Sequence, residues 1–172
     1  LKLFRIHGIT RDEKWMTQNE GGWYYEQLEL GFNYRMTDIQ AALGSSQMKK
    51  LDSFLKRRNE IAQRYNEAFR GRSELIVPEP LEGTNSGWHL YVIQILNEKR
   101  KEMFDSLRKA GIGVNVHYLP VYHHPYYRRH GYEDVYCPNA EALYKNMMSL
   151  PIYPGMTEEM QEFVIEKIVN EK

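Results

Sequence analysis

Three features are scarce in this sequence of 172 residues, and each scarcity excludes a class of protein. A single cysteine, Cys137, excludes an intramolecular disulfide framework and fits a reducing compartment. Lys and Arg number 23 and so do Asp and Glu, so no net charge recruits nucleic acid or an anionic membrane. No apolar run approaches the roughly 20 residues that span a bilayer, and no signal peptide is visible. We therefore expect a soluble cytoplasmic chain of one domain, or one domain with an extension.

Familiar catalytic motifs are also missing. The sequence contains no Gly-rich phosphate loop, no G-x-S-x-G elbow and no H-E-x-x-H. No lysine stands in an apolar setting that would plainly lower its pKa for Schiff-base chemistry. The residues by themselves therefore indicate an α/β domain with an anion-binding or sugar-binding rim, without a complete catalytic apparatus.

The stretch GFNYRMTDIQAALG, residues 31–44, is the first candidate for function. Thr37 and Gln40 have the spacing of a capping box, which predicts a helix that starts after Thr37. Asn33, Tyr34 and Arg35 precede that start, where side chains are often aimed at a ligand. Asn and Arg together could hold a phosphate or carboxylate. A plain turn whose arginine pairs with an acid is the alternative, and spacing alone favours it.

Apolar spacing predicts one long helix from about Asp38 to Phe69, on the order of 50 Å long, of the kind that bridges two domains or subunits. Lys56-Arg57-Arg58 within it is expected to belong to the solvated face. The opening LKLFRIHG is amphipathic, places Gly8 where a C-terminal cap belongs, and has no initiator Met. We expect a piece of a longer protein that begins inside a helix or just at its front.

Beyond Gly71, short strands and helices alternate. Strands are expected at 75–77, 88–96, 112–118 and 150–153. Helices are expected after an Asn97 cap, from Cys137 or Asn139 with Met147 on the inner face, and after a Thr157 cap. The predicted fold class is α/β (α+β), with a small sheet covered on one face by helices.

The segment 114–137 holds four histidines and Cys137, which raises a zinc hypothesis. The spacing argues against metal, because no Cys-x2-Cys occurs and the adjacent His123 and His124 would point apart on a strand. A rim of His, Tyr and Arg suited to sugars, bases and phosphates is the favoured interpretation. Structural histidines packed against tyrosines are the alternative. His89, which enters a strand, more simply caps a sheet edge than faces a site.

The stretch GFNYRMTDIQAALGSSQMKKLD resembles the signature of the DegT/StrS-type nucleotide-sugar aminotransferases, which are pyridoxal-phosphate enzymes of the aspartate aminotransferase fold type (fold-type I). The likeness continues in the family's order through LKLFRIHGITRD, WHLYVIQI, AGIGVNVHYLPVYHHPYY and CPNAEALYKNMMSLPIYPGMTEEM. It implies that residues 1–36 are the tail of the large cofactor domain and an interface loop, 37–70 a linking helix and 71–172 the C-terminal small domain. The pairing of YYEQLELGFNYRMTDIQAALG with GIGVNVHYLPVY resembles members that aminate a UDP-linked 4-keto-6-deoxy-N-acetylhexosamine in pseudaminic acid biosynthesis.

The resemblance also implies roles for four residues. Asn33 would cross a dimer interface to bind the phosphate of pyridoxal 5′-phosphate in the other subunit, and Arg35 would support that interface or the phosphates of the substrate. His117 and Tyr118 would line the sugar-nucleotide pocket. The implied protein is a homodimer with shared active sites that uses a nucleotide sugar and L-glutamate, with no metal, nucleic acid or membrane partner.

One departure from the family is large. Its cofactor-binding lysine, the aromatic residue on the pyridine ring and the acid at the ring nitrogen all precede the segment that LKLFRIHG matches. We therefore expect the parent protein to be a transaminase and this chain alone to be inactive. A nucleotide-sugar-binding or regulatory module without catalysis, and a metal-binding module, are the alternatives.

Overall fold

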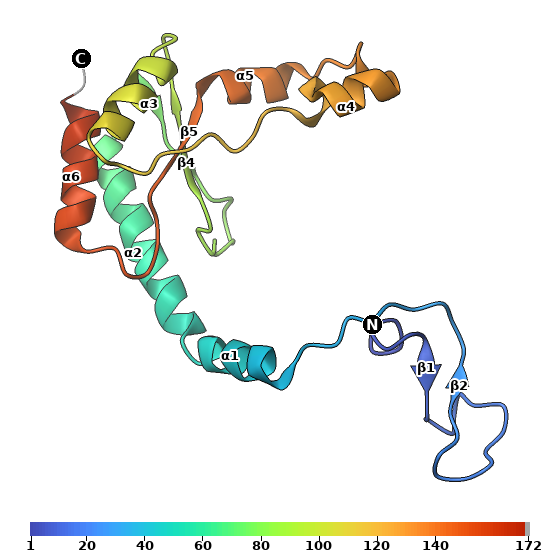
Figure 1. The fold of residues 1–172 in the computed structure, drawn as a ribbon. Helices are drawn as coiled ribbons and strands as arrows, with labels where there is room; N and C mark the ends of the chain where they lie inside the picture. Colours follow the sequence, from blue (N-terminus) through green and yellow to red (C-terminus); the bar gives the residue numbers. More distant parts are fainter. Residues whose placement is uncertain (171–172) are drawn as a thin grey trace. The chain divides into compact units, whose positions relative to one another are not determined.

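The computed structural model describes residues 1–170, and contacts divide the chain into two compact units. Unit 1 is Leu1–Lys50 and unit 2 begins at Leu51 (Figure 1). Among the described residues, no helix is both long enough and apolar enough to cross a membrane.

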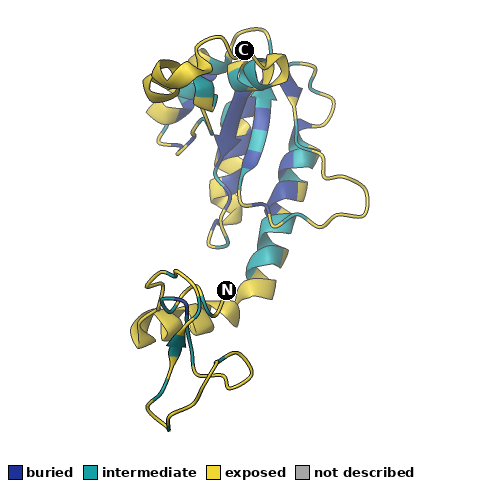
Figure 2. Ribbon diagram, turned by 90° about the vertical axis from the view of Figure 1, so that its right-hand side faces the viewer, coloured by how far each residue is buried: buried dark blue, intermediate teal, exposed yellow. Residues whose placement is uncertain are grey.

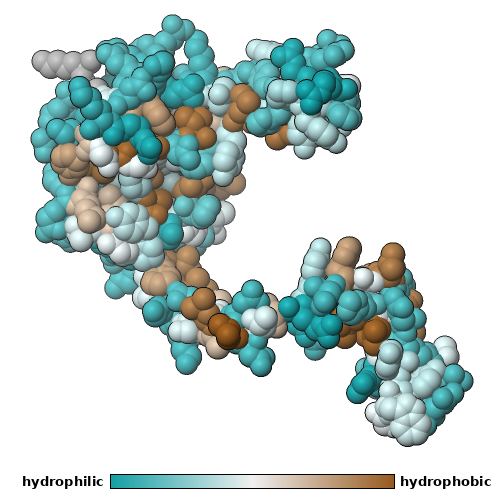
Figure 3. All heavy atoms as spheres, viewed as in Figure 1, coloured by the Kyte–Doolittle hydropathy of each residue, from teal (hydrophilic) through white to brown (hydrophobic). Residues whose placement is uncertain are grey.

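Unit 1 has almost no interior. Strands β1 (Ile9–Thr10) and β2 (Glu26–Gln27) pair antiparallel, and helix α1 spans Asp38–Met48. Gly8 is the one buried residue among residues 1–50, and the unit is otherwise exposed or half-buried (Figure 2). Large apolar side chains consequently lie on its surface (Figure 3). Unit 1 is therefore held by backbone pairing rather than by a hydrophobic core.

The start of α1 follows the sequence prediction. The Thr37 hydroxyl accepts from Gln40 N at 3.3 Å, and Thr37 N donates to Gln40 Oε1 at 3.0 Å, so the capping box is confirmed. Residues 1–8, predicted as part of a helix, form turns instead. Gly8 does adopt the left-handed conformation of a cap, with φ of 72°.

The single helix predicted over residues 38–69 is wrong. Helix α1 ends at Met48, Lys49 and Lys50 form a turn, and α2 spans Leu51–Phe69. No residue of α1 is buried, whereas the second half of α2 is packed in the core. The division into two compact units falls between Lys50 and Leu51.

Unit 2 contains a three-stranded antiparallel sheet in the order β3-β4-β5. The strands are β3 (Leu75–Ile76), β4 (Tyr91–Ile95) and β5 (Met147–Leu150), and the helices that cover one face with α2 are α3 (Arg100–Lys109) and α6 (Glu158–Val169) (Figure 1). Alternate residues of β4 are fully buried and join the core with side chains of all three helices. The fold is thus α+β, with the predicted one-sided layer of helices.

Three predicted elements of unit 2 are displaced. Residues 112–118 form no strand, only an isolated bridge between Asn115 and Ser149. Helix α5 (Pro138–Asn146) stops before Met147, which begins β5. The strand expected at 150–153 ends at Leu150 instead, because Pro151 lacks the N–H that a strand ladder needs.

Of the N-caps predicted for α3 and α6, the first is wrong and the second is confirmed. Asn97 has φ of 60° and does not cap α3, whose N-cap residue is Lys99. The Thr157 hydroxyl does cap α6, because it accepts from Met160 N at 3.2 Å.

An arm made of η1 (Val121–His123), α4 (Pro125–Tyr127), η2 (Arg128–Tyr132) and α5 leads away from the sheet (Figure 1). No residue from 118 to 146 is buried. Stacked and edge-on rings hold the arm locally, including Tyr126 on His130 at 4.2 Å between ring centroids. The arm, like unit 1, is therefore surface without a core of its own.

The prediction for Lys56-Arg57-Arg58 is wrong for the two arginines. Arg57 Nη2 donates to the carbonyl of Met156 at 2.8 Å. Arg58 Nη1 donates to the carbonyls of Trp88 at 2.8 Å and Ile152 at 3.0 Å. Both side chains therefore tie α2 to loops at the edge of the core, while Lys56 is exposed.

Two tyrosines are fully buried in the core and donate hydrogen bonds from their hydroxyls. Tyr65 OH donates to the carbonyl of Pro151 at 3.0 Å, and Tyr91 OH donates to Asn66 Oδ1 at 2.6 Å. Their rings lie 4.9 Å apart between centroids. Burial raises the pKa of both hydroxyls above the ordinary value of 10.0.

Unit 2 is therefore expected to lose stability as the pH rises above 10. The folded state holds the two phenol protons that the unfolded state releases, so stability is intact below the unfolded pKa and falls by up to about 1.4 kcal/mol per pH unit for each group. Urea unfolding from pH 8 to 11.5 measures the slope. Tyr91→Phe should make the slope shallower, and the exposed Tyr25→Phe should not. An equal slope in both variants would contradict the assignment.

Candidate functional site

The segment of Asn33 lies against residues 4–8, held by backbone hydrogen bonds. These run from Phe32 N to Phe4 O (2.7 Å), from His7 N to Phe32 O (2.9 Å) and from Tyr34 N to Arg5 O (2.9 Å). Asn33 itself forms an antiparallel bridge with Ile6. The position of Asn33 and Arg35 is therefore set by pairing with a segment far away in the sequence.

Two glycines allow this close approach. A Cβ built on Gly8 would lie 1.8 Å from the carbonyl oxygen of Glu29, and one built on Gly31 would lie 2.3 Å from Gly8 N. Both obstacles are backbone atoms, which do not move aside as a flexible side chain does. No residue with a side chain fits at either position without separating the two segments.

Asn33, Arg35 and His7 form one polar cluster in unit 1. Arg35 Nε donates to Asn33 Oδ1 at 3.1 Å, and Arg35 Nη2 is 3.3 Å from His7 Nε2. A guanidinium has donors only, so His7 Nε2 is the acceptor. Arg35 therefore does not pair with an acid, as the plain-turn alternative held. His7 was missed by the sequence reasoning, because 28 residues separate it from Arg35.

The cluster presents unused donors on an exposed surface. No described residue accepts from Asn33 Nδ2, and no carboxylate within residues 1–170 forms an ion pair with Arg35. An amide N–H beside a guanidinium is suited to an anion with several oxygens, such as a phosphate. The cluster thus offers exposed donors of the kind that bind such an anion.

His117 and Tyr118 lie in unit 2, and the structure gives them different environments. His117 Nδ1 is 2.8 Å from Ser149 Oγ, and Asn115 Nδ2 donates to His117 Nε2 at 3.2 Å. Both ring nitrogens are therefore engaged by the protein. The ring of Tyr118 stands edge-on to that of His117, with 4.7 Å between the ring centroids, and the residue Tyr118 is 72% exposed. Of the two, Tyr118 is exposed, whereas His117 is half-buried.

The histidine-rich arm contains a tight polar contact of its own. Tyr122 OH donates to Glu141 Oε1 at 2.7 Å, and His123 Nε2 lies 2.6 Å from the same oxygen. The hydrogen bond between Tyr122 and Glu141 lowers the pKa of the Glu141 carboxyl. The same bond raises the pKa of the Tyr122 hydroxyl to about 12. These groups fasten η1 to α5, which agrees with the alternative of structural histidines for His123.

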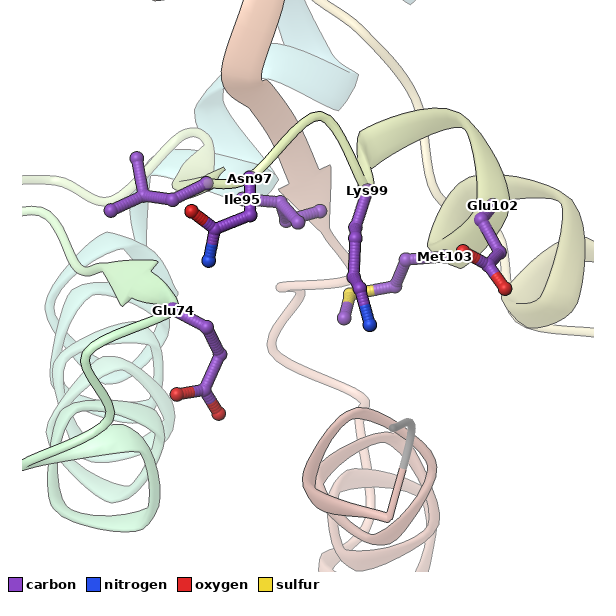
Figure 4. Close-up of a pocket in the computed structure, with 7 residues that line it drawn as sticks. Glu74, Ile95, Asn97, Lys99, Glu102 and Met103 are labelled. Carbon is purple, nitrogen blue, oxygen red and sulfur yellow. The ribbon is translucent and has the colours of Figure 1, made fainter.

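No group of three or more His, Cys, Asp or Glu side chains among residues 1–170 is arranged to hold a metal ion. A cavity of about 250 Å³ lies at the end of β4 beside α3, with Glu74, Asn97 and Lys99 around it (Figure 4). None of the four site residues predicted from the sequence lines this cavity.

Comparison with solved structures defines the class. The chain is similar to Helicobacter pylori PseC, an aminotransferase involved in the biosynthesis of pseudoaminic acid, with a TM-score of 0.83 and 29% identity over 98% of this chain and 44% of that one. It is similar to the PLP-form of Spr1654 from Streptococcus pneumoniae, with a TM-score of 0.81 and 31% identity over 96% of this chain and 40% of that one. The fold is that of sugar aminotransferases of fold-type I, and the predicted fold class is confirmed.

The sequence comparisons then give the family. The family model for the DegT/DnrJ/EryC1/StrS aminotransferases matches residues 1–169, and the chain belongs to this family. It is 35% identical over 167 residues to the UDP-4-amino-4,6-dideoxy-N-acetyl-beta-L-altrosamine transaminase of Campylobacter jejuni, covering 95% of this chain and 42% of that protein. The chain thus spans less than half the length of these relatives, and it matches their C-terminal portion, as predicted.

Proposed function

We propose that the parent protein is a pyridoxal 5′-phosphate-dependent aminotransferase that transfers an amino group from L-glutamate to a 4-keto nucleotide sugar. A UDP-linked 4-keto-6-deoxy-N-acetylhexosamine is the proposed substrate, in the synthesis of a bacterial surface polysaccharide or a sialic-acid-like sugar. The names of the Campylobacter and Helicobacter relatives support this choice. The observation that carries the proposal is that Asn33 and Arg35 are exposed, that no described residue accepts from Asn33 Nδ2, and that no carboxylate within residues 1–170 forms an ion pair with Arg35.

Each site residue has a task that its environment supports. Asn33 donates its amide N–H to a phosphate oxygen, and Arg35 adds positive charge next to it. Tyr118 offers an exposed ring and hydroxyl to the sugar nucleotide, and His117 holds that segment to Ser149. The cofactor, when bound, supplies the electron sink for amino transfer. Its lysine lies in the part of the protein that precedes these residues in the family, so we propose that this chain alone is inactive.

We also propose that the protein works as a homodimer with shared active sites. Support comes from unit 1, which buries almost no side chain and exposes Met36, Ile39 and Leu43 around the start of α1 (Figure 3). Contiguous exposed apolar surfaces of this kind are typical of protein–protein interfaces. The single cysteine is free and exposed, which fits a cytoplasmic location.

Substitution of Asn33 in the full-length protein tests the cofactor role. Asn33→Ala removes one charge-assisted hydrogen bond and should weaken pyridoxal 5′-phosphate binding about tenfold. Asn33→Asp places an anion against the phosphate and should weaken binding by about a hundredfold. Cofactor absorbance during titration measures both constants.

Asn85, an exposed residue of the loop after Pro80, provides the matched control, since Asn85→Asp adds the same charge elsewhere. Wild-type cofactor affinity in Asn33→Asp would refute the assignment. If the wild type and all variants bind the nucleotide sugar equally well and none binds the cofactor, the result would favour the non-catalytic module instead.

A further inference from the structure

His7 is the one member of the polar cluster that the proposed function leaves without a task. It stands on the segment that pairs with residues 32–34, and its φ of 65° is in the left-handed region that residues with a side chain seldom adopt. Backbone strain of this kind persists where the surrounding structure enforces it, and it is frequent at functional sites.

Two hydrogen bonds connect the three side chains, and Arg35 is the donor in both. His7 Nε2 accepts from Arg35 Nη2, and Arg35 Nε donates to Asn33 Oδ1. A side-chain amide has two ends that differ only in hydrogen bonding, and a phosphate oxygen accepts from the nitrogen end alone. Because Arg35 engages the oxygen end, Asn33 Nδ2 is the end that remains available.

Arg35 is a long, exposed side chain, so one hydrogen bond to Asn33 leaves its guanidinium with several orientations. The second contact, to His7, selects the orientation in which Nε faces Asn33. His7 is itself held in place, since its backbone N–H donates to the carbonyl of Phe32 at 2.9 Å. The imidazole therefore acts at a distance from the ligand, through Arg35.

We propose that His7 is a positioning residue that orients Arg35, and through it the amide of Asn33, so that Asn33 Nδ2 faces a phosphate. The orientation of the amide stands on the geometry of unit 1, while the identity of the ligand rests on the proposed function. His7 makes no direct contact with the ligand in this arrangement.

A purely conformational role for His7 predicts a different order of variants. Asn tolerates a left-handed φ better than other residues with a side chain, so His7→Asn would be the mildest change if only the backbone mattered. The Oε1 of Gln is three bonds from Cβ, as Nε2 of His is, whereas the Oδ1 of Asn is two bonds away. Positioning through Nε2 therefore predicts that His7→Gln preserves the two hydrogen bonds and His7→Asn does not.

The first measurement uses the full-length protein without ligand. Nuclear magnetic resonance spectra report the Arg35 Nε–H and Asn33 Nδ2–H₂ signals in the wild type and in His7→Gln, His7→Asn and His7→Leu. We expect the wild-type signals in His7→Gln, and averaged or shifted signals in His7→Asn and His7→Leu. Wild-type signals in His7→Leu, or retention in His7→Asn with loss in His7→Gln, would overturn the proposal.

The second measurement adds inorganic phosphate to the same four proteins. Phosphate should shift the Asn33 Nδ2–H₂ signal, with an affinity about tenfold weaker in His7→Asn and His7→Leu and within about twofold of wild type in His7→Gln. Equal phosphate affinity in all four proteins would overturn the positioning role. If phosphate shifts no signal of the wild type while the ligand-free spectra behave as expected, the positioning role stands and the phosphate assignment of the proposed function fails.

Discussion

Gly8→Ala is expected to abolish the pairing of unit 1 and leave unit 2 folded. Gly8 has φ of 72°, and a Cβ there would lie 1.8 Å from the backbone oxygen of Glu29. The left-handed conformation costs an alanine about 1–2 kcal/mol, and a backbone overlap of this size brings the total to roughly 4 kcal/mol or more. Unit 1 has no core to absorb that loss, because Gly8 is its one buried residue.

Hydrogen exchange at single residues measures this outcome. The amide of Phe32, which donates to Phe4, should lose protection in Gly8→Ala, while the core amide of Ile93 should keep it. In the full-length protein, the same variant should lose cofactor affinity because Asn33 is no longer held.

Substitutions at two other glycines separate the cost of the left-handed conformation from the cost of the overlap with backbone atoms. Gly83 has φ of 76° and no atom within 4 Å of a built Cβ, so Gly83→Ala carries the conformational cost alone, about 1–2 kcal/mol. Gly22 has neither a positive φ nor a close neighbour, and Gly22→Ala should be nearly neutral. If Gly8→Ala costs no more than Gly83→Ala, the close approach to Glu29 is not the reason that glycine stands there.

The parts of the fold that local chemistry decides were predictable from the sequence. The hydroxyls of Thr37 and Thr157 mark the helix starts because an N-cap needs only residues three positions apart. The alternation from Tyr91 to Ile95 likewise reports one buried face of a strand. Each of these signals lies within one short segment of the chain.

Other features depend on contacts that no short segment records. All four residues of β5 are buried, three of them apolar, and a short run of this kind is equally consistent with the end of a helix, which is why Met147 was assigned to one. The break at Lys49 and Lys50 carries no Gly or Pro, so the periodicity of the residues on either side predicted one helix.

The candidate site likewise combines residues that a local pattern predicts with residues that only distant contacts bring together. Asn33 and Arg35 were found because they lie two positions apart beside a capped helix, and the family resemblance gave them a role. His7 joins them only through the antiparallel pairing of residues 4–8 with residues 32–34. The engagement of both nitrogens of His117 by Asn115 and Ser149 also follows from a bridge between distant segments, which a residue pattern does not show.

Arg58→Met is expected to lower the free energy of unfolding of unit 2 by about 3 kcal/mol, although the substitution keeps the volume and the apolar stem of the side chain. Arg58 Nη1 donates to the carbonyls of Trp88 and Ile152, at 2.8 and 3.0 Å, from the middle of α2. Methionine leaves both carbonyl oxygens without that donor in a partly buried place, where water replaces it poorly. The loop at Ile152 and the entry to β4 should loosen together.

The neighbouring Lys56 supplies the control, because it stands on the same helix and is exposed. Lys56→Met removes the same unit of charge and should change stability by less than about 0.5 kcal/mol. Arg58→Lys keeps the charge but not the planar fork, so it should fall between the two. Urea unfolding of the three variants measures the differences. If Arg58→Met and Lys56→Met lose equal stability, charge alone matters and the carbonyl contacts contribute nothing. The expected gap between them would show that Arg58 holds α2 to the loops at the edge of the core, whereas Lys56 belongs to the solvated face.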